Sequence, residues 1–183
     1  MKRMKMNLQQ FSYTAVQGKR VIYLMRLLSD ASTSAAALVP YATEDSLSIS
    51  ADGDTTATKD GPITTPGTPE IEITKTAILA IESGQASATS IVDKMRNAVL
   101  NGSTVEVWEA NLDRPAATTN KYKGVYYQGL MTSFEQTANA EDLVEVSFTF
   151  KANGKGADGD VTVTAAQQEI ASYVFADTTK TGV

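Results

Sequence analysis

Cysteine and histidine are both absent from this chain of 183 residues. Without cysteine the chain has no disulfide and no thiolate nucleophile, and without histidine it lacks the commonest general base. Zinc sites built on these two residue types are excluded as well. Only 7% of the residues are aromatic, which is few for a sugar-binding groove, and no apolar run approaches the ~20 residues that span a membrane. These absences predict a protein that is not an enzyme, binds no cofactor or metal and does not enter a membrane.

The charge that is present is mostly negative. Asp and Glu number 21 against 16 Lys and Arg, which gives a net charge of −5. Such a surface favours solubility and disfavours retention of nucleic acid, because phosphate binding relies on Lys and Arg. The apolar fraction of 42% is that of an ordinary soluble domain, and the chain is long enough for one core. We therefore expect one soluble domain, located in the cytoplasm.

The two ends of the chain are expected to lie outside this domain. The start, Met1-Lys2-Arg3-Met4-Lys5, is basic, but the polar segment 7–10 follows where a signal peptide has an apolar stretch. We expect a flexible N-terminal tail at 1–17, a domain at 18–177 and a C-terminal tail at 178–183.

Hydrophobic patterning predicts a fold dominated by antiparallel strands. The apolar run 20–28 is typical of a strand buried on both faces, while 46–50 and 144–150 alternate as half-buried strands do. The predicted fold class is α+β, mainly antiparallel β, with two packed β-sheets flanked by one α-helix. The segments expected to be strands are 20–28, 46–50, 70–75, 104–110, 122–135 (with Gly124 and Gly129 as bends or bulges), 144–150 and, after a turn at 153–159, 161–163.

A long segment between two of these strands, 52–69, consists almost entirely of Gly, Pro, Thr and Asp. Because such residues punctuate turns and cannot build a core, we expect a long loop joining two antiparallel strands. A loop of this length is usually functional or disordered. It is either an arm that orders on a neighbouring subunit or a plain flexible loop. The candidate inter-subunit residues are Asp52, Asp54, Thr55, Thr56, Thr58, Lys59, Asp60, Gly61 and Pro62.

Two helices are expected. Segment 87–101 carries an apolar stripe at helical spacing, Ser90 and Asp93 approximate a capping box, and Gly102 follows the last turn. A second capping box, Thr164 to Gln167, opens a short helix near the C-terminus with Ile170, Tyr173 and Val174 on one side.

The chemical motifs all have a simpler structural interpretation. Gly154-Lys155-Gly156 lacks the hydroxyl residue and the strand–helix setting of a phosphate loop, and Asp52-Gly53-Asp54 lacks the glutamate that ends a calcium loop. Glu106 and Glu109 are too close in sequence to flank a catalytic cleft. Segment 121–127 mixes basic and aromatic residues as single-strand-binding sheets do, but an acidic chain favours a strand with an aromatic core face.

Several segments, in the order in which they occur, resemble the major tail proteins of long-tailed, non-contractile phages and prophages of Gram-positive bacteria such as lactococci. The resemblance covers about 18–177. Two features depart from the family pattern. The start is longer, with Met4 or Met6 as alternative first residues, and no immunoglobulin-like domain follows Val183. The segments are Gly18-Lys19-Arg20-Val21-Ile22-Tyr23-Leu24, Thr43-Glu44-Asp45-Ser46-Leu47-Ser48, Thr58-Lys59-Asp60-Gly61-Pro62, Val107-Trp108-Glu109, Lys121-Tyr122-Lys123-Gly124-Val125-Tyr126-Tyr127-Gln128-Gly129, Ser133-Phe134-Glu135 and Asn153-Gly154-Lys155-Gly156.

The resemblance implies a tail tube fold and a virion structural role. In that family, subunits join in hexameric rings that stack into the tube through which DNA leaves the virion, after assembly in the host cytoplasm. It also implies a tape measure protein and tail terminator and distal tail proteins as partners, with segment 58–62 reaching adjacent subunits. DNA would pass along the lumen without specific binding, which suits a polar sheet face. The candidate lumen-facing residues are Glu70, Glu72, Thr74, Glu145, Ser147 and Thr149.

Two alternatives stay open at this point. The chain could be a monomeric β-sandwich binding module, such as an adhesin or a carbohydrate binder, or the tube subunit of a contractile tail or secretion device, which shares the fold.

Overall fold

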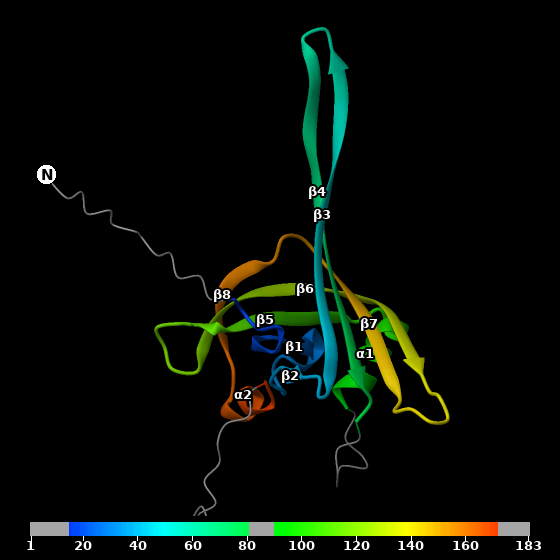
Figure 1. The fold of residues 1–183 in the computed structure, drawn as a ribbon, viewed down its shortest axis with the longest axis vertical. Helices are drawn as coiled ribbons and strands as arrows, with labels where there is room; N and C mark the ends of the chain where they lie inside the picture. The colour runs from blue at the N-terminus through cyan, green and yellow to red at the C-terminus, as the bar shows by residue number, and fades with distance from the viewer. Residues whose placement is uncertain (1–14, 81–89, 172–183) are drawn as a thin grey trace, which may run out of the picture.

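The computed structural model describes residues 15–80 and 90–171 of the chain (Figure 1). Its elements, in chain order, are η1 (Gly18–Arg20), β1 (Val21–Leu27), η2 (Leu28–Asp30), β2 (Ala37–Leu38), β3 (Ala42–Thr58), β4 (Gly61–Ile78), α1 (Ile91–Asn101), β5 (Thr104–Pro115), β6 (Lys121–Thr137), β7 (Glu145–Ala152), β8 (Ala157–Thr162) and α2 (Ala165–Ala171).

The eight strands form one antiparallel sheet in the order β2-β1-β5-β6-β7-β4-β3, with β8 paired to β6. This confirms the predicted class, but the strands are hydrogen-bonded into one sheet where two packed sheets were expected. The long strand β6 explains the difference, because it belongs to both halves of the sheet. Its first half pairs with β8 over Lys121–Tyr126, and its second half pairs with β7 over Gly129–Thr137.

The larger core lies between the β3-β4-β7-β6 half of the sheet and the β1-β5 half, and α1 packs against it. Strand β1 is buried on both faces, as its continuous apolar sequence predicts. Tyr23 and Met25 enter the larger core, whereas Ile22 and Leu24 enter a smaller core with Val161.

The helix α1 follows its sequence signals closely. Its N-cap Ser90 accepts a hydrogen bond from the backbone N–H of Asp93, and Gly102 adopts a left-handed φ of 62° at the C-cap. Val92, Met95 and Ala98 of the predicted stripe are buried. The predicted first turn at 87–89 lies outside the described residues.

The predicted loop at 52–69 is wrong. Strands β3 and β4 continue through it as one long hairpin that rises from the body (Figure 1), with pairing from Ala42↔Ala77 to Thr58↔Gly61. Both faces of its outer part are exposed, so no apolar alternation marks it in the sequence. Threonine is a good strand former, and proline is tolerated where a strand has only one neighbour, as β4 does here.

Three smaller expectations are corrected or completed. Gly124 and Gly129 are sites of close backbone approach: a Cβ at either residue would lie 1.9 Å from a carbonyl oxygen of the neighbouring strand. The turn after β7 ends earlier than 153–159, because β8 begins at Ala157. The Thr164–Gln167 capping box is confirmed by two reciprocal hydrogen bonds of 2.9 and 3.3 Å.

The ends of the predicted domain are only partly visible. Residues 1–14 and 172–183, which include Tyr173 and Val174, lie outside the described residues, as does the side chain of Ile170. The domain boundaries therefore stay a prediction. Neither helix in 15–80 and 90–171 has the length and hydropathy that crossing a membrane requires.

Candidate functional site: a polar sheet face and its hairpin

The six residues predicted to face a lumen lie on one face of the sheet. The strand register places Thr74 beside Thr149 and Glu72 beside Lys151, and side chains at every second position share a face. Glu70, Glu72 and Thr74 on β4 therefore share one face with Glu145, Ser147 and Thr149 on β7, although only Thr74 and Thr149 lie directly opposite each other. We call this surface the polar face.

The polar face extends over four adjacent strands, beyond the residues that the sequence suggested. The register adds Ser46, Ser48 and Ser50 from β3 on one side, and Ser133 and Glu135 from β6 on the other. The alternation in 46–50 was a usable signal for the three serines. The contribution of β6 depends on a register shift between Met131 and Ser133, which no local pattern indicates.

Hydroxyl contacts and carboxylates dominate the polar face. The side-chain oxygens of Thr74 and Thr149 lie 3.4 Å apart across the β4–β7 pair. The lone cation is Lys151, whose Nζ lies 3.8 Å from Glu70 and 3.7 Å from Glu72. All three side chains are well exposed, so these ion pairs add little stability. Their effect is to neutralise the single positive charge on an otherwise acidic and hydroxyl-rich surface.

The opposite face of β3 and β4 turns toward the core and buries one lysine. Lys75 is 1% exposed, its ammonium pairs with the Asp45 carboxylate directly opposite, and its Nζ lies 5.9 Å from the centroid of the Tyr23 ring. Although the lysine and aspartate are within ion-pair distance, Nζ makes no contact with hydrogen-bond geometry among the described residues. Burial raises the pKa of Tyr23 above its ordinary 10.0, and the nearby carboxylates of Glu109 and Asp45 raise it further.

The outer part of the hairpin, residues 52–69, is called the arm below. It contains all nine predicted inter-subunit residues. A two-residue turn, Lys59 and Asp60, joins its strands; the Thr58 hydroxyl donates to the Gly61 carbonyl at 2.6 Å, and Gly61 has a φ of 124° that favours glycine. At the base of the arm, Gly67 passes so close to Asp52 that a Cβ on Gly67 would overlap the Asp52 carbonyl oxygen. The arm is therefore a continuous two-stranded ribbon that ends in a tight turn.

Both borders of the four-stranded polar half are unpaired within 15–80 and 90–171. Strand β3 pairs only with β4, and β6 beyond Leu130 pairs only with β7, because β5 begins at Thr104 opposite Leu130. Exposed strand edges are templates for further strands. Within the described residues, the chain thus presents one unpaired strand edge on either side of the polar face.

A model of the phage tail tube protein family matches residues 15–158. The chain belongs to this family. It is a structural protein of the virion tail, as the resemblance in sequence indicated.

Relatives of this tail tube protein agree in sequence and in fold. A tail protein of Staphylococcus phage phiMR25 is 30% identical over 145 residues, which cover 76% of this chain and 72% of that protein. The tail tube of phage SPP1 superposes with a TM-score of 0.66 at 21% identity, covering 92% of this chain and 95% of that one. The tail of a gene transfer agent particle, refined with C6 symmetry, gives a TM-score of 0.58 at 11% identity, covering 78% and 98%.

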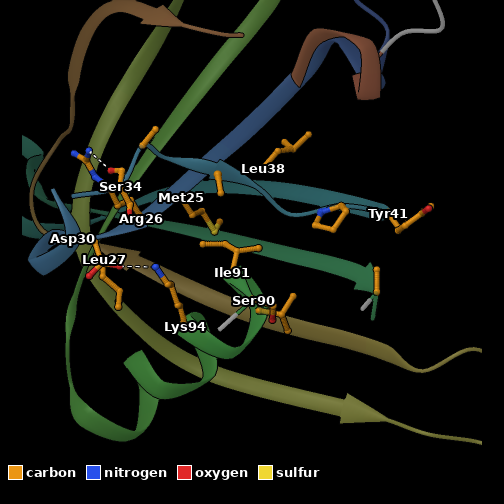
Figure 2. Close-up of a pocket in the computed structure, with 15 residues that line it drawn as sticks. Met25, Arg26, Leu27, Asp30, Ser34, Leu38, Tyr41, Ser90, Ile91 and Lys94 are labelled. Atoms are coloured by element: carbon orange, nitrogen blue, oxygen red, sulfur yellow. Dashed lines mark hydrogen bonds and ion pairs between the residues drawn. The ribbon is translucent and has the colours of Figure 1, made fainter. Parts of the chain in front are cut away.

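A cavity of about 680 Å³ lies between α1 and the segment from β1 to the start of β3 (Figure 2). Met25, Leu38 and Ile91 line it, and the Lys94–Asp30 ion pair of 2.7 Å stands at one end. None of the predicted site residues of the tail tube protein contributes to this cavity.

The two glutamates considered as an acid–base pair point to opposite faces of β5. Glu106 is buried, accepts two hydrogen bonds from Arg26 (2.9 and 2.7 Å) and one from the Tyr126 hydroxyl at 2.7 Å. Glu109 faces the larger core, where burial raises its pKa above the ordinary 4.5. The two carboxyl groups therefore do not converge. Within the described residues no group of three potential ligands could hold a metal ion.

Proposed function

We propose that this chain assembles into hexameric rings that stack into the tail tube, and that its polar face lines the channel through which DNA leaves the virion. The observation that carries the proposal is the combination of one polar sheet face with an unpaired strand at each border. A monomer in this form would expose both edges, whereas a ring would pair every one of them. The role is structural and includes no catalytic step.

Ring closure is favoured by the strand directions. Neighbouring strands in the order β3-β4-β7-β6 are all antiparallel, so β3 and β6 run in opposite directions. When β3 of one copy lies beside β6 of the next, the new pair is antiparallel as well. An even number of strands per subunit therefore gives a closed barrel of uniform pairing.

The width of such a barrel suits a conduit. Four strands from each of six copies make 24, and at about 4.8 Å per strand the circumference is about 115 Å and the diameter at least about 37 Å. Strand tilt widens it further, and barrels of 16–18 strands already hold an aqueous channel. The hexamer is supported by the C6 symmetry of the gene transfer agent tail with the same fold.

The chemistry of the polar face suits DNA that must slide. Phosphate binding needs Lys or Arg that can release counterions, and the one lysine of this face is neutralised by Glu70 and Glu72. Hydroxyl groups keep the surface wetted. As partners we propose further tube copies, a tape measure protein that sets the length, and terminator and distal tail proteins at the two ends.

Electron microscopy and sedimentation of the concentrated protein test the assembly. We expect rings or tubes; a strict monomer at all concentrations contradicts the proposal and favours a monomeric binding module.

A variant at the β3 edge tests how the ring closes. Ile49 lies on β3 and is 62% exposed, so Ile49→Lys should leave the fold intact but place a charge in the new strand pair and prevent rings. The matched control is Leu100→Lys on α1, where the side chain is 72% exposed. Equal assembly of both variants would show that β3 is not the lateral edge.

Deletion of 55–65 tests the arm. These residues pair with one another and, at their lower end, with Gly53 and Asp54 of the same arm, so the remaining domain should fold, while tubes should stop growing. Tubes from the shortened protein would show that the arm is dispensable.

A further inference from the structure

The core-facing side of the sheet holds an amine and a carboxyl group in contact, and the tube function uses neither. Lys75 on β4 lies directly opposite Asp45 on β3 and beside Phe148 on β7. Directly opposed residues of antiparallel strands have Cβ atoms about 4.5–5.5 Å apart, so the flexible stem of the lysine reaches the aspartate. The two groups form an ion pair, and the Lys75 ammonium has no partner with hydrogen-bond geometry among the described residues.

The surroundings of this pair are apolar. Lys75 is 1% exposed, and its neighbours Tyr23 and Phe148 are 4% and 1% exposed. The lysine Nζ lies 5.9 Å from the centroid of the Tyr23 ring. Burial favours uncharged groups, and both groups lose their charge when one proton passes from the ammonium to the carboxylate. An amine and a carboxylic acid held in contact are the reactants of amide formation.

The access of water to this site depends on the edge of the sheet. The side chain of Asp45 is 20% exposed, and its strand β3 has β4 as its single neighbour within the described residues. In the proposed ring, β6 of the next copy lies beside β3 and covers this edge. Ring closure therefore removes the remaining hydration of the carboxyl group. The exclusion of water favours both the neutral pair and a reaction that releases water.

We propose that Lys75 and Asp45 join through an isopeptide bond once the ring has closed, so that each subunit links its own hairpin covalently. The inference rests on the proposed function, since ring closure completes the site. The neutral lysine nitrogen attacks Cγ of the protonated carboxyl group and forms the C–N bond. The bond from Cγ to the hydroxyl oxygen breaks, and the hydroxyl leaves with one amine hydrogen as water. The ion pair already contains every atom and proton of the amide and the water, so no co-reactant is required.

Proximity and burial both favour this reaction. Well-oriented groups in intramolecular reactions reach effective concentrations of about 10⁵–10⁸ M. Burying the ion pair requires two charges to lose their hydration, whereas the amide is neutral and leaves no ammonium in the core. The bond also fixes Asp45 opposite Lys75, so β3 and β4 cannot slip against each other after assembly.

A second lysine–aspartate pair of the same chain serves as a matched control. Lys123 on β6 lies directly opposite Asp160 on β8, and their charged atoms are 2.5 Å apart. These side chains are 53% and 35% exposed, so water solvates both charges. The two pairs share their residue types and their place in an antiparallel ladder, and they differ in burial. We therefore expect the exposed pair to stay unlinked.

Mass spectrometry of the denatured protein tests the bond. We expect the unassembled chain to have the mass of its sequence, and the chain from stored tubes to be lighter by one water molecule. Trypsin cuts after lysine and arginine, so it should release from the tubes a branched peptide that joins 27–59 to 60–94 and is uncut after Lys75. Cleavage after Lys123 should proceed normally.

Two variants identify the source of the lost water. Lys75→Met replaces the amine by an apolar side chain of similar length, so it should form tubes whose subunits keep their full mass. Lys123→Met, the matched control, should form tubes and lose water as the unmodified chain does. Water lost by succinimide formation at an Asp-Gly step such as Asp52-Gly53 would persist in Lys75→Met and would leave trypsin free to cut after Lys75.

The outcomes separate this inference from the proposed function. If the unmodified chain forms no tubes, the proposed function fails and the inference fails with it. If tubes form and their subunits keep their full mass, or lose water without yielding the branched peptide, the isopeptide bond alone is overturned. A branched peptide that appears as fast in the unassembled chain would overturn the role of ring closure.

Discussion

The buried pair Asp45–Lys75 allows a prediction in which the two partners behave very differently. The Lys75 side chain is 1% exposed and that of Asp45 is 20% exposed. The ammonium is therefore removed from water almost completely, while the carboxylate keeps part of its hydration. Replacing one partner leaves the charge of the other in place. The loss in free energy of unfolding therefore depends on whether the buried ammonium or the partly exposed carboxylate stays behind.

Asp45→Ala leaves an ammonium ion unpaired inside the core. Breaking a buried pair in this way costs about 3–5 kcal/mol, and we expect about 3 kcal/mol because Asp45 itself lies near solvent. Lys75→Met replaces the lysine by an apolar side chain of similar length. The remaining Asp45 is reachable by water, and removing the desolvated ammonium offsets the lost attraction, so we expect a change within about 1 kcal/mol.

Urea denaturation followed by fluorescence measures both effects. The single tryptophan, Trp108, is a suitable reporter because Arg26 lies 5.1 Å above its ring and Tyr126 lies 5.1 Å away. The protein is kept below the concentration at which it assembles, and equal m-values confirm that the same transition is compared. The double variant should be no less stable than Asp45→Ala alone.

If Lys75→Met lowers the free energy of unfolding as much as Asp45→Ala does, this reasoning is refuted. It would mean that the lysine contributes net attraction, through Asp45 or the Tyr23 ring, that exceeds the cost of burying it.

Three further predictions concern the body of the domain. Glu106→Ala should cost about 3 kcal/mol in denaturant unfolding because it removes the only carboxylate paired with Arg26 among the described residues and leaves the guanidinium with two carbonyl acceptors, whereas Asp113→Ala, at an exposed ion pair with Arg20, should cost at most about 1 kcal/mol. Gly124→Ala should cost roughly 1–3 kcal/mol because its Cβ meets the Glu109 carbonyl, while Gly18→Ala, with open space around it, should leave the melting temperature unchanged. Since burial raises the folded-state pKa of Glu109, the folded protein binds a proton more tightly than the unfolded chain, and the stability contribution of this group falls as pH rises above 4.5. Glu109→Gln should therefore raise the free energy of unfolding at pH 7 and remove the part of its decline between pH 4.5 and 7 that Glu109 causes. The same dependence on pH in the variant and the unmodified protein would contradict the raised pKa of Glu109.

Elements that pack a core were predictable because burial leaves a periodic pattern. In β7, Val146, Phe148 and Phe150 are fully or almost fully buried, as their alternation with polar residues indicates. The limits of α1 follow from Ser90 and Gly102, whose side-chain acceptor and left-handed backbone satisfy the helix ends. In each case one short segment contains the whole physical cause.

The arm could not be predicted by the same means. With both faces in water, a strand needs no apolar alternation, and Pro62, Pro66 and Pro69 then resemble the punctuation of a loop. The close passage of Gly67 and Asp52 is specified by residues on two strands, so it becomes visible only when the register is known. The positive φ of Tyr41 gave no signal either, because tyrosine is an unusual choice for that conformation.

The register of the hairpin links the buried lysine to the proposed assembly. A slip of one residue between β3 and β4 is opposed by the hydrophobic pattern, because it would turn one strand's apolar residues to the polar face. A slip of two residues keeps both faces, and the repetitive Ser and Thr sequence hardly resists it. It would, however, separate Asp45 from Lys75 and leave the ammonium buried without its partner. The Asp45–Lys75 pair, although it adds little to stability, thus selects one register. That register fixes the position of the arm and of the β3 edge along the strand direction in every copy.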